Sequence, residues 1–224
     1  MSKRVLCALL ATAVALAFTN GSVLADEPLN LYPHKVELVA YINSGGYAQD
    51  VAAVALQANK YLVKRIPRGA KGRKMAVVFD IDETTLTNVR QILANDFGYV
   101  PKVWDAWVLE GKAPAIIPVQ TIYDTAVRTK IDVFFITGRK ERDRASTERN
   151  LREVGYDTWT KIFFTPDQEP DQPQSVRGFK IDTRRKLTQE GYVIIANIGD
   201  QDSDLAGGYA ERTFKLPNPF YIAK

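Results

Sequence analysis

The sequence is poor in cysteine and histidine, with one of each among its 224 residues. The single cysteine, Cys7, excludes an internal disulfide framework, so the fold must depend on its apolar core. The single histidine, His34, lies far along the chain from every motif described below. We therefore expect a structural or surface role for His34.

Long apolar runs are also missing, apart from the 14 residues Val5–Phe18. This run is too short for a comfortable membrane span. Two basic residues precede it and Val23-Leu24-Ala25 follows, a pattern that predicts a secretory signal peptide over residues 1–25. Because Arg4 stands three residues before Cys7, a lipoprotein signal is not expected. We expect a periplasmic or secreted protein without a stable membrane anchor.

A strong excess of one charge is absent too. Residues 1–25 hold two basic and no acidic side chains, so their removal leaves 28 basic and 26 acidic ones. This small excess gives no reason to expect a nucleic-acid polymer as partner. The composition, 46% hydrophobic and 25% charged, is that of a soluble globular protein. Cys7 would leave with the signal peptide, and thiol chemistry with it.

Residues 26–74 are predicted to form an N-terminal helical segment. Apolar residues recur at helical spacing over Pro33–Lys64, and Ser44-Gly45-Gly46 divides this stretch into two helices. Arg65–Lys74 is basic and contains glycine and proline, which indicates a solvated connection. The two helices also offer a surface through which two copies of the chain could form a homo-oligomer.

From Met75 onward, short apolar runs alternate with amphipathic segments. The predicted strands are 75–79, 131–136, 162–164, 193–198 and, more weakly, 213–216. The predicted helices are 118–129, 142–154 and 178–190. Continuously apolar strands separated by helices indicate an α/β domain, residues 75–224, with a parallel sheet flanked by helices. Ligands of such sheets bind beyond the carboxyl ends of the strands.

Two segments depart from this alternation. Phe97–Ala115 is rich in aromatic residues, and Trp104 and Trp107 share one helical face. We expect a small cap at about residues 96–116, in which the tryptophans either line the rim of a substrate pocket or pack in the core. Residues 165–177 hold three prolines and are predicted to form a surface loop.

Acidic residues follow the first and fourth predicted strands. Asp80 and Asp82 come after the first, and Asp200 and Asp204 follow the fourth. Alternate residues of a strand share one face, so Asp80 and Asp82 can point the same way. Like charges this close repel each other unless a cation lies between them. The carboxylates of both strands can hold a hard, oxygen-seeking cation, and Mg²⁺ fits best.

Groups suited to an anion lie beside these carboxylates. Thr137-Gly138-Arg139 ends the second strand, and Lys180 begins the helix after the third. An anion, a divalent metal and a spare carboxylate make a phosphoryl-transfer site. Asp80 would then attack phosphorus, and Asp82 would protonate the leaving oxygen and later deprotonate water. The Thr137 hydroxyl and nearby backbone N–H groups would hold the phosphoryl oxygens.

Lys180 and Arg139 have other interpretations. Lys161 and Lys186 lie near Lys180 in the sequence, although a helix start after a proline-rich loop favours Lys180. Arg139 either contacts the substrate at the rim or pairs with an acid two or four residues on, Glu141 or Asp143. Neither choice is settled by spacing alone.

A calcium loop is a rival for the last acidic cluster. Its acids take the first, third, fifth and twelfth positions, as in a calcium-binding helix-loop-helix: Asp200, Asp202, Asp204 and Glu211. However, Leu205 stands where that loop requires glycine, and an apolar strand precedes it instead of a helix. The sequence therefore argues against calcium, and Asp202 is expected to be a plain loop acid.

Taken together, DIDETTLTN, FFITGR, a later lysine and IGDQDSD resemble the four motifs of the haloacid-dehalogenase (HAD) superfamily. Within it, the chain is similar to the secreted acid phosphatases with four key aspartates, the bacterial class B and C enzymes and the plant acid phosphatase and vegetative storage protein group. Residues 147–159 and 104–118 are similar to that group as well. The likeness covers about residues 75–216.

The resemblance implies a Rossmann-like HAD core with a small cap. It makes Asp80 the nucleophile, Asp82 the acid and base, Thr137 a phosphate-binding residue and Lys180 the neutralising lysine. The metal-site acids would be Asp200, as a direct ligand, and Asp204, directly or through water; the backbone carbonyl of Asp82 would complete the protein ligands.

We therefore expect a secreted, Mg²⁺-dependent acid phosphatase that hydrolyses small phosphomonoesters, with nucleoside monophosphates among the candidates. One alternative is a phosphate-binding or storage protein with little turnover, which the retained pair Asp80 and Asp82 argues against. Another is a phosphotransferase that passes the phosphoryl group to an alcohol.

Overall fold

A computed structural model describes residues 28–167 and 175–223. The predicted signal peptide lies outside the described residues, as does most of the predicted proline-rich loop. Residues 32–224 form one compact unit, and the residues up to Leu31 are a separate one. Over the described ranges, no helix is both long and apolar enough to cross a membrane.

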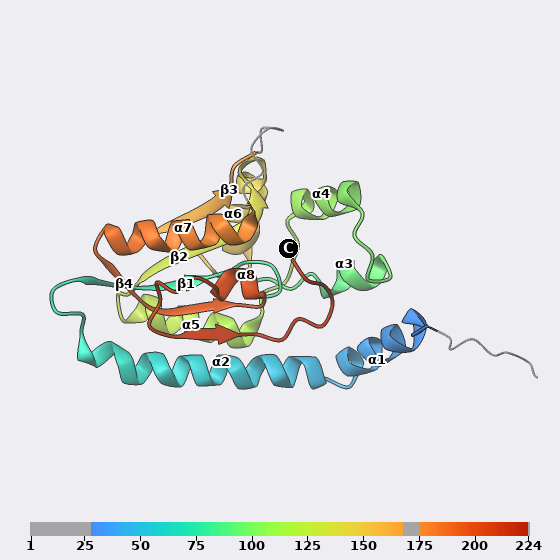
Figure 1. Cartoon of the computed structure of the whole chain (residues 1–224), viewed down its shortest axis with the longest axis horizontal. Coiled ribbons are helices and arrows are strands. Elements are labelled where there is room, and N and C mark those ends of the chain that lie inside the picture. The colour runs from blue at the N-terminus through green and yellow to red at the C-terminus, as the bar shows by residue number, and fades with distance from the viewer. Residues whose placement is uncertain (1–27, 168–174, 224) are drawn as a thin grey trace, which may run out of the picture. The chain divides into compact units, whose positions relative to one another are not determined.

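The centre of the compact unit is a parallel five-stranded sheet in the order β3-β2-β1-β4-β5 (Figure 1). The strands are β1 (Lys74–Phe79), β2 (Asp132–Lys140), β3 (Lys161–Thr165), β4 (Tyr192–Gly199) and β5 (Thr213–Lys215). Each overlaps a predicted run, and β2 continues four residues beyond its run; β5, the edge strand, buries only its middle residue. The α/β fold is confirmed.

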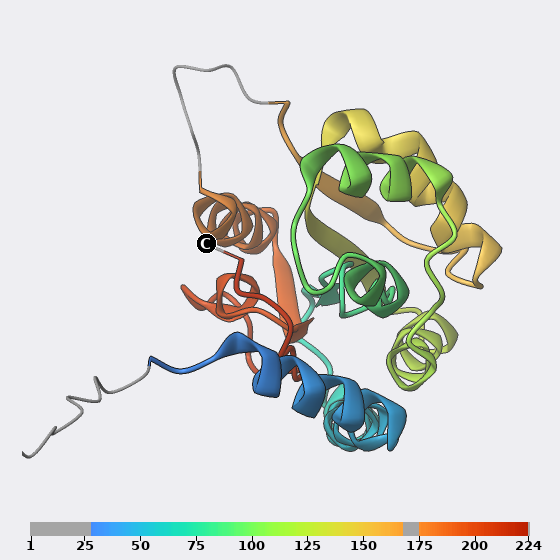
Figure 2. The same ribbon diagram turned by 90° about the vertical axis from the view of Figure 1, so that its right-hand side faces the viewer.

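Helices cover both faces of the sheet (Figure 2). On one face, α7 (Val176–Gln189) packs through Leu187 against Val78 and Phe134. On the other, the buried side chains of three helices join the larger core cluster; these helices are α2 (Gly46–Arg65), α5 (Ile117–Arg128) and α6 (Arg144–Glu153). Alternate residues of β1 point to opposite faces of the sheet, so Val77 and Phe79 pack in the larger core cluster and Ala76 and Val78 in the smaller one.

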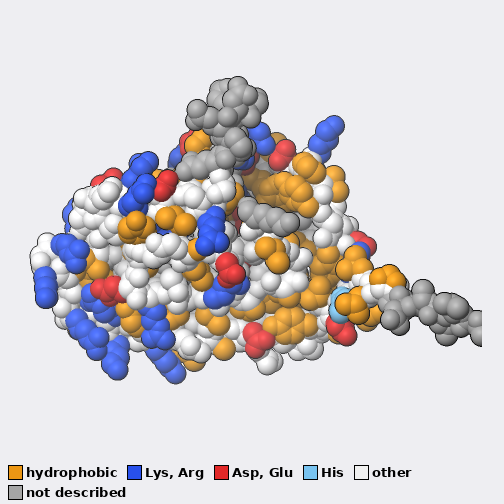
Figure 3. All heavy atoms as spheres, in the orientation of Figure 1, with side chains coloured by type: hydrophobic (Ala, Val, Ile, Leu, Met, Phe, Trp, Pro, Cys, Tyr) orange, Lys and Arg blue, Asp and Glu red, His pale blue; other side chains and the backbone are white. Residues whose placement is uncertain are grey.

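The N-terminal helices are α1 (Leu31–Asn43) and α2, and they break at the predicted glycines. Gly45 has φ +80°, a left-handed conformation that glycine adopts without strain. After α2, the short helix η1 (Ile66–Arg68) leads into β1. Lysine and arginine side chains gather at this end (Figure 3), as expected of a solvated connection; the exposed ones are Lys60, Lys64, Arg68, Lys71, Arg73 and Lys74.

Two helices precede α5, and the second of them falls within residues 96–116, where a cap is expected. They are α3 (Val89–Ala94) and α4 (Pro101–Glu110), and α4 places Trp104 and Trp107 as predicted on one helix. Pro101 occupies the first turn of α4, where its missing N–H costs nothing, and Gly111 ends the helix at φ +65°. The remaining short elements are η2 (Glu141–Asp143) and α8 (Asp202–Leu205).

Candidate active site

A cavity of about 580 Å³ opens at the carboxyl edge of the sheet. Residues that follow β1 and β4, the end of β2 and the start of α7 all line it, together with the cap and segment 217–223. Its charged and polar lining residues are Asp80, Asp82, Gln91, Arg139, Lys180, Asp200, Gln201, Ser203 and Asp204. The cavity thus lies where parallel sheets bind their ligands.

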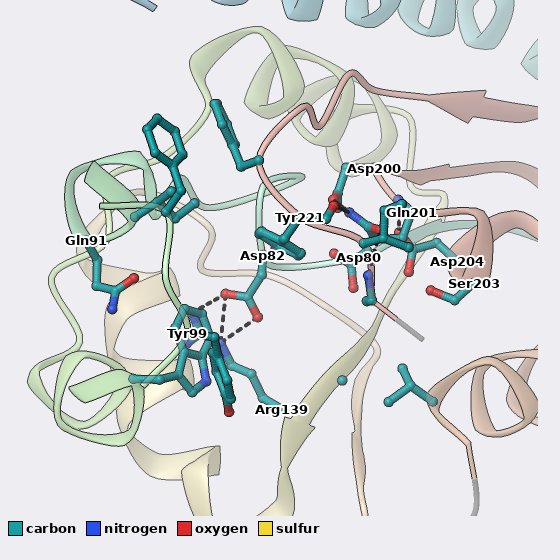
Figure 4. Close-up of a pocket in the computed structure, with 18 of the residues that line it drawn as sticks. Asp80, Asp82, Gln91, Tyr99, Arg139, Asp200, Gln201, Ser203, Asp204 and Tyr221 are labelled. Atoms are coloured by element: carbon teal, nitrogen blue, oxygen red, sulfur yellow. Dashed lines mark hydrogen bonds and ion pairs between the residues drawn. The ribbon is translucent and has the colours of Figure 1, made fainter. Parts of the chain in front are cut away.

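Three carboxylates meet at the inner end of the cavity (Figure 4), and one ammonium group joins them. Oxygen atoms of Asp80, Asp200 and Asp204 lie within 4.8 Å of one another, and all three residues are buried. The Nζ atom of Lys180 donates to Asp80 and, at 2.6 Å, to Oδ1 of Asp204. The structure therefore brings Lys180 to the site, whereas Lys161 and Lys186 are exposed.

Burial sets the electrostatics of this cluster. Loss of water raises the pKa of Asp200 to about 6, with repulsion from Asp204 as the next cause. Burial likewise raises the pKa of Asp80 well above its usual value, with repulsion from Asp204 second. Burial disfavours the Lys180 ammonium, but attraction by Asp204 and Asp80 outweighs it and raises the Lys180 pKa.

The donor set fits a hard divalent cation. With all three carboxylates ionised, the cluster has an excess of two negative charges over the Lys180 ammonium, and a divalent cation would neutralise it. Oxygen donors of this kind suit Mg²⁺ or Mn²⁺. Two hydrogen bonds hold the Asp200 carboxylate in place: Thr84 Oγ1 donates to it at 2.9 Å and Asn218 Nδ2 at 2.7 Å.

Asp82 points away from this cluster (Figure 4). Arg139 donates to it from Nη2, 2.6 Å from Oδ1, and from Nε, 3.1 Å from Oδ2. Asn88 Nδ2 lies 2.9 Å from the same Oδ1. Arg139 is 4% exposed, so it neither projects to the surface nor pairs with Glu141 or Asp143, the partners considered from the sequence. Its charge is stabilised by Asp82 instead.

Thr137 and Gly138 lie in an irregular part of β2. Between Ile136 and Lys140 the pairing with β3 is interrupted, so residues 137–139 leave the regular ladder. Thr165 Oγ1 fixes this bulge by donating to the carbonyl oxygens of Gly138 and Arg139 at 3.0 and 2.9 Å. Gly138 lines the cavity, and the Thr137 hydroxyl accepts the Arg139 N–H. Thr137 itself is fully buried and is not among the lining residues.

Segment 217–223 forms a wall of the cavity that sequence reasoning missed. Asn218 contacts Asp200, and Gln201 Oε1 accepts the N–H of Ala223 at 3.0 Å. The hydroxyl of Tyr221 donates to Oε2 of Glu83 at 2.7 Å. Burial raises the pKa of Glu83 to about 8, with repulsion from Asp82 second. No periodic pattern marks this segment, so nothing in its residues indicates the contact with the site.

Arg184 is a second residue that the motifs did not indicate. It follows Lys180 by one helical turn and is 1% exposed. Its guanidinium donates to the backbone carbonyls of Asp204, Ala206 and Gly208. The same face of α7 thus contacts both the Asp204 carboxylate and the backbone that carries it. The i, i+4 spacing from Lys180 could have revealed it.

The two cap tryptophans differ in position. Trp104 lines the cavity, with the guanidinium of Arg139 6.0 Å from its ring. Trp107 is not among the lining residues; it packs against the core, and its Nε1 donates to Asn88 Oδ1 at 2.7 Å. Phe97 and Tyr99, from the aromatic-rich segment expected at the rim, line the cavity too, as do Phe220 and Tyr221, which the sequence did not indicate.

The acids of the rival calcium loop do not converge. Asp202 is exposed, and Glu211 pairs with Arg65 at 2.6 Å. Asp200 and Asp204 instead join Asp80, which belongs to a different strand end. The geometry agrees with the sequence in disfavouring calcium.

Known proteins share both the sequence and the fold. The chain is 39% identical to the stem 28 kDa glycoprotein of Glycine max over 153 residues. These residues are 66% of this chain and 60% of that protein, so the match covers less than two thirds of the relative. The chain is 34% identical to acid phosphatase 1 of Solanum lycopersicum over 185 residues, 81% of this chain and 71% of the relative. Vegetative storage protein 1 of Arabidopsis thaliana is 30% identical over 148 residues, 64% of this chain and 54% of the relative.

A solved structure of a class C acid phosphatase from Bacillus anthracis has the same fold. It superposes with a TM-score of 0.69 at 22% identity and covers 86% of each chain. Residues 13–224 match the family described as HAD superfamily, subfamily IIIB (acid phosphatase). The resemblance seen in the four motifs is confirmed: the chain belongs to subfamily IIIB of the HAD superfamily, the acid phosphatases.

Proposed function

We propose that this protein is a secreted, Mg²⁺-dependent acid phosphatase that hydrolyses small phosphomonoesters through an aspartyl-phosphate. The observation that carries the proposal is the buried meeting of Asp80, Asp200, Asp204 and Lys180 at the inner end of an open cavity. Such a cluster is costly to bury without a ligand, which is the mark of a functional site.

The reaction has two balanced steps. An oxygen of Asp80 bonds to phosphorus as the bond from phosphorus to the leaving oxygen breaks, and Asp82 gives that oxygen a proton. Water then attacks phosphorus, Asp82 takes its proton, and the bond to Asp80 breaks to release phosphate. Lys180 and the bulge at Thr137 hold the phosphoryl oxygens. The metal bound by Asp80, Asp200 and Asp204 would supply charge neutralisation for the dianion.

The cavity supports a substrate with a planar leaving group. Phe97, Tyr99, Trp104 and Tyr221 line it with aromatic rings, on which a base or an aryl group can stack. Nucleoside monophosphates combine a phosphate for the inner end with a base for these rings. Gln91 adds a polar group to the outer part.

The test is release of p-nitrophenol from its phosphate by the purified protein, with Mg²⁺, with EDTA, and with Asp80→Asn. We expect EDTA to stop turnover and Asp80→Asn to lower kcat roughly a thousandfold or more. Asp202→Asn is the matched control, since it removes one carboxylate from an exposed position beside the site. If Asp80→Asn keeps its turnover, Asp80 is not the nucleophile.

The similarity to vegetative storage proteins supports a second candidate, a phosphate-binding protein with little turnover. It predicts that the intact protein binds inorganic phosphate but releases no p-nitrophenol with any divalent metal. A phosphotransferase would instead release more p-nitrophenol than phosphate once an acceptor alcohol is in excess.

Secretion is tested separately. We expect protein recovered from outside the cytoplasm to begin at Asp26, as its intact mass would show. If the protein in that fraction still contains residues 1–25, the predicted cleavage after Ala25 is wrong.

A further inference from the structure

Asn88 is wholly buried at the N-terminus of α3, between the cap and the first strand end. Its side-chain amide contacts three residues: Oδ1 accepts from Trp107 Nε1 at 2.7 Å, and Nδ2 donates to Asp82 at 2.9 Å and Glu83 at 3.1 Å. An indole N–H can only donate and an ionised carboxylate can only accept. Trp107 therefore permits one orientation of the amide, with its NH₂ group toward the carboxylates.

The backbone of Asn88 is fixed as well. Its N–H donates to Oε1 of Glu83 at 2.5 Å, and Glu83 is itself buried with φ +55°. The intervening turn is tied to β1 by the N–H groups of Thr85 and Leu86, which both donate to the carbonyl of Ile81 at 2.8 Å. The side chain of Asn88 thus projects from a rigid support rather than from a loose loop.

The two oxygens of Asp82 are treated differently by this arrangement. Oδ1 accepts from Asn88 Nδ2 and from Arg139 Nη2 and Nε, whereas Oδ2 has a single donor among the described residues, Arg139 Nε at 3.1 Å. The Asp82 side chain is 17% exposed and lines the cavity. With Oδ1 occupied, Oδ2 is the oxygen left to carry a proton to a leaving group.

We propose that Asn88 is a positioning residue that holds Oδ1 of Asp82 and so presents Oδ2 to the leaving oxygen, and that Trp107 keeps its amide in the required orientation. This inference rests on the proposed phosphatase function. It assigns a task to two residues, Asn88 in the first motif and Trp107 in the cap, that touch neither the phosphate nor the metal-site acids.

The inference predicts a dependence on the leaving group. A p-nitrophenolate ion leaves readily without a proton, whereas an alkoxide does not, so misplacing Asp82 should harm alkyl phosphates most. We expect Asn88→Ala to lower kcat for glycerol 2-phosphate roughly 10- to 100-fold, and kcat for p-nitrophenyl phosphate less than about threefold. KM should change little with either substrate, because the phosphate-binding groups are untouched.

Two further variants keep the test decisive. Trp107→Phe keeps an aromatic, though smaller, ring and removes the N–H, so it should give a smaller loss with the same preference for the alkyl substrate. Asn95→Ala is the matched control: Asn95 ends the same helix, and its amide only donates to the carbonyl of Gln91 at 3.0 Å. It should leave both substrates unchanged.

An equal loss on both substrates, or none, in Asn88→Ala and Trp107→Phe would overturn the positioning role while leaving the phosphatase proposal in place. If the unmodified protein turns over neither substrate with any divalent metal, the proposed function fails, and the positioning role with it. Thermal unfolding of each variant, compared with Asn95→Ala, identifies a loss caused by unfolding.

Discussion

Replacing Lys180 with methionine isolates the charge that Lys180 contributes to the acidic cluster. Methionine has a similar length and no charge, so the packing of α7 is largely kept. Lys180 donates to both Asp80 and Asp204 from a side chain that is only 5% exposed. The substitution therefore leaves two buried carboxylates without their cation.

The magnitude follows from that burial. Breaking a buried ion pair by removing one partner costs about 3–5 kcal/mol, because the remaining charge is uncompensated. For a domain of this size, each kcal/mol lowers Tm by about 2–4 °C, so a fall of about 6–20 °C is expected in metal-free protein at pH 8. The deficit should shrink at pH 5, where the orphaned carboxyl groups can bind protons instead.

The assay is thermal unfolding at pH 5 and pH 8 with EDTA and with Mg²⁺, together with kcat for p-nitrophenyl phosphate. Mg²⁺ should recover part of the lost stability, since it restores positive charge to the cluster, but not the turnover. Lys186→Met is the matched control, because Lys186 lies on the same helix and is exposed. Equal effects of the two substitutions on Tm and kcat would refute the assignment of Lys180.

Two other predictions concern the metal-site acids. In metal-free protein, burial raises the pKa of Asp200 from 3.8 to about 6. Between these two pH values the folded state holds a proton that the unfolded chain has lost. The shift should therefore contribute about 3 kcal/mol to the free energy of unfolding below pH 4, and this contribution should be lost as the pH rises to about 6. Calorimetry in EDTA should show this fall and Mg²⁺ should abolish it, whereas a flat profile in EDTA would contradict it. Gly199→Ala should weaken Mg²⁺ activation severalfold, because a Cβ there would lie 2.4 Å from Cβ of Asp204. Gly191→Ala, which strains φ but meets no atom within 4 Å, should lower Tm without that effect on Mg²⁺, and identical titrations of the two variants would count against the steric argument.

Much of the fold could be predicted because burial leaves a pattern along the chain. The strands β1 and β4 are buried on both faces, so their apolar runs stand out from the amphipathic helices between them. Their parallel arrangement then places Asp80 and Asp200 at one edge without knowledge of any distance. Lys180 was chosen for its place near a helix start after the proline-rich loop and for its likeness to the lysine of the HAD motifs; the helix itself begins at Val176.

The rest depends on contacts between residues that no spacing rule connects. Arg139 was expected at the rim or on the surface; it lines the cavity, but its guanidinium is buried in an ion pair with Asp82 that no spacing rule indicates. Trp107 follows Trp104 by three positions, yet only Trp104 lines the cavity. Trp107 packs against the core, where Asn88 provides a buried acceptor for its N–H. Helix α3 has six residues, too few for a periodic pattern to identify it.

The wall made by segment 217–223 has a consequence for the order of folding. Tyr221 reaches Glu83 across 138 residues, and Asn218 secures Asp200. The Tyr221–Glu83 contact spans little more of the chain than the β1–β4 pairing of Lys74 with Tyr192. Segment 217–223 has no helix or strand of its own, however, so we expect it to dock only after the sheet on which it lies has formed. The refolding chain would thus form the sheet, with Asp80 and Asp200 at its edge, before this wall docks. The enzyme should gain activity only in the last phase of refolding, after most of its secondary structure has returned.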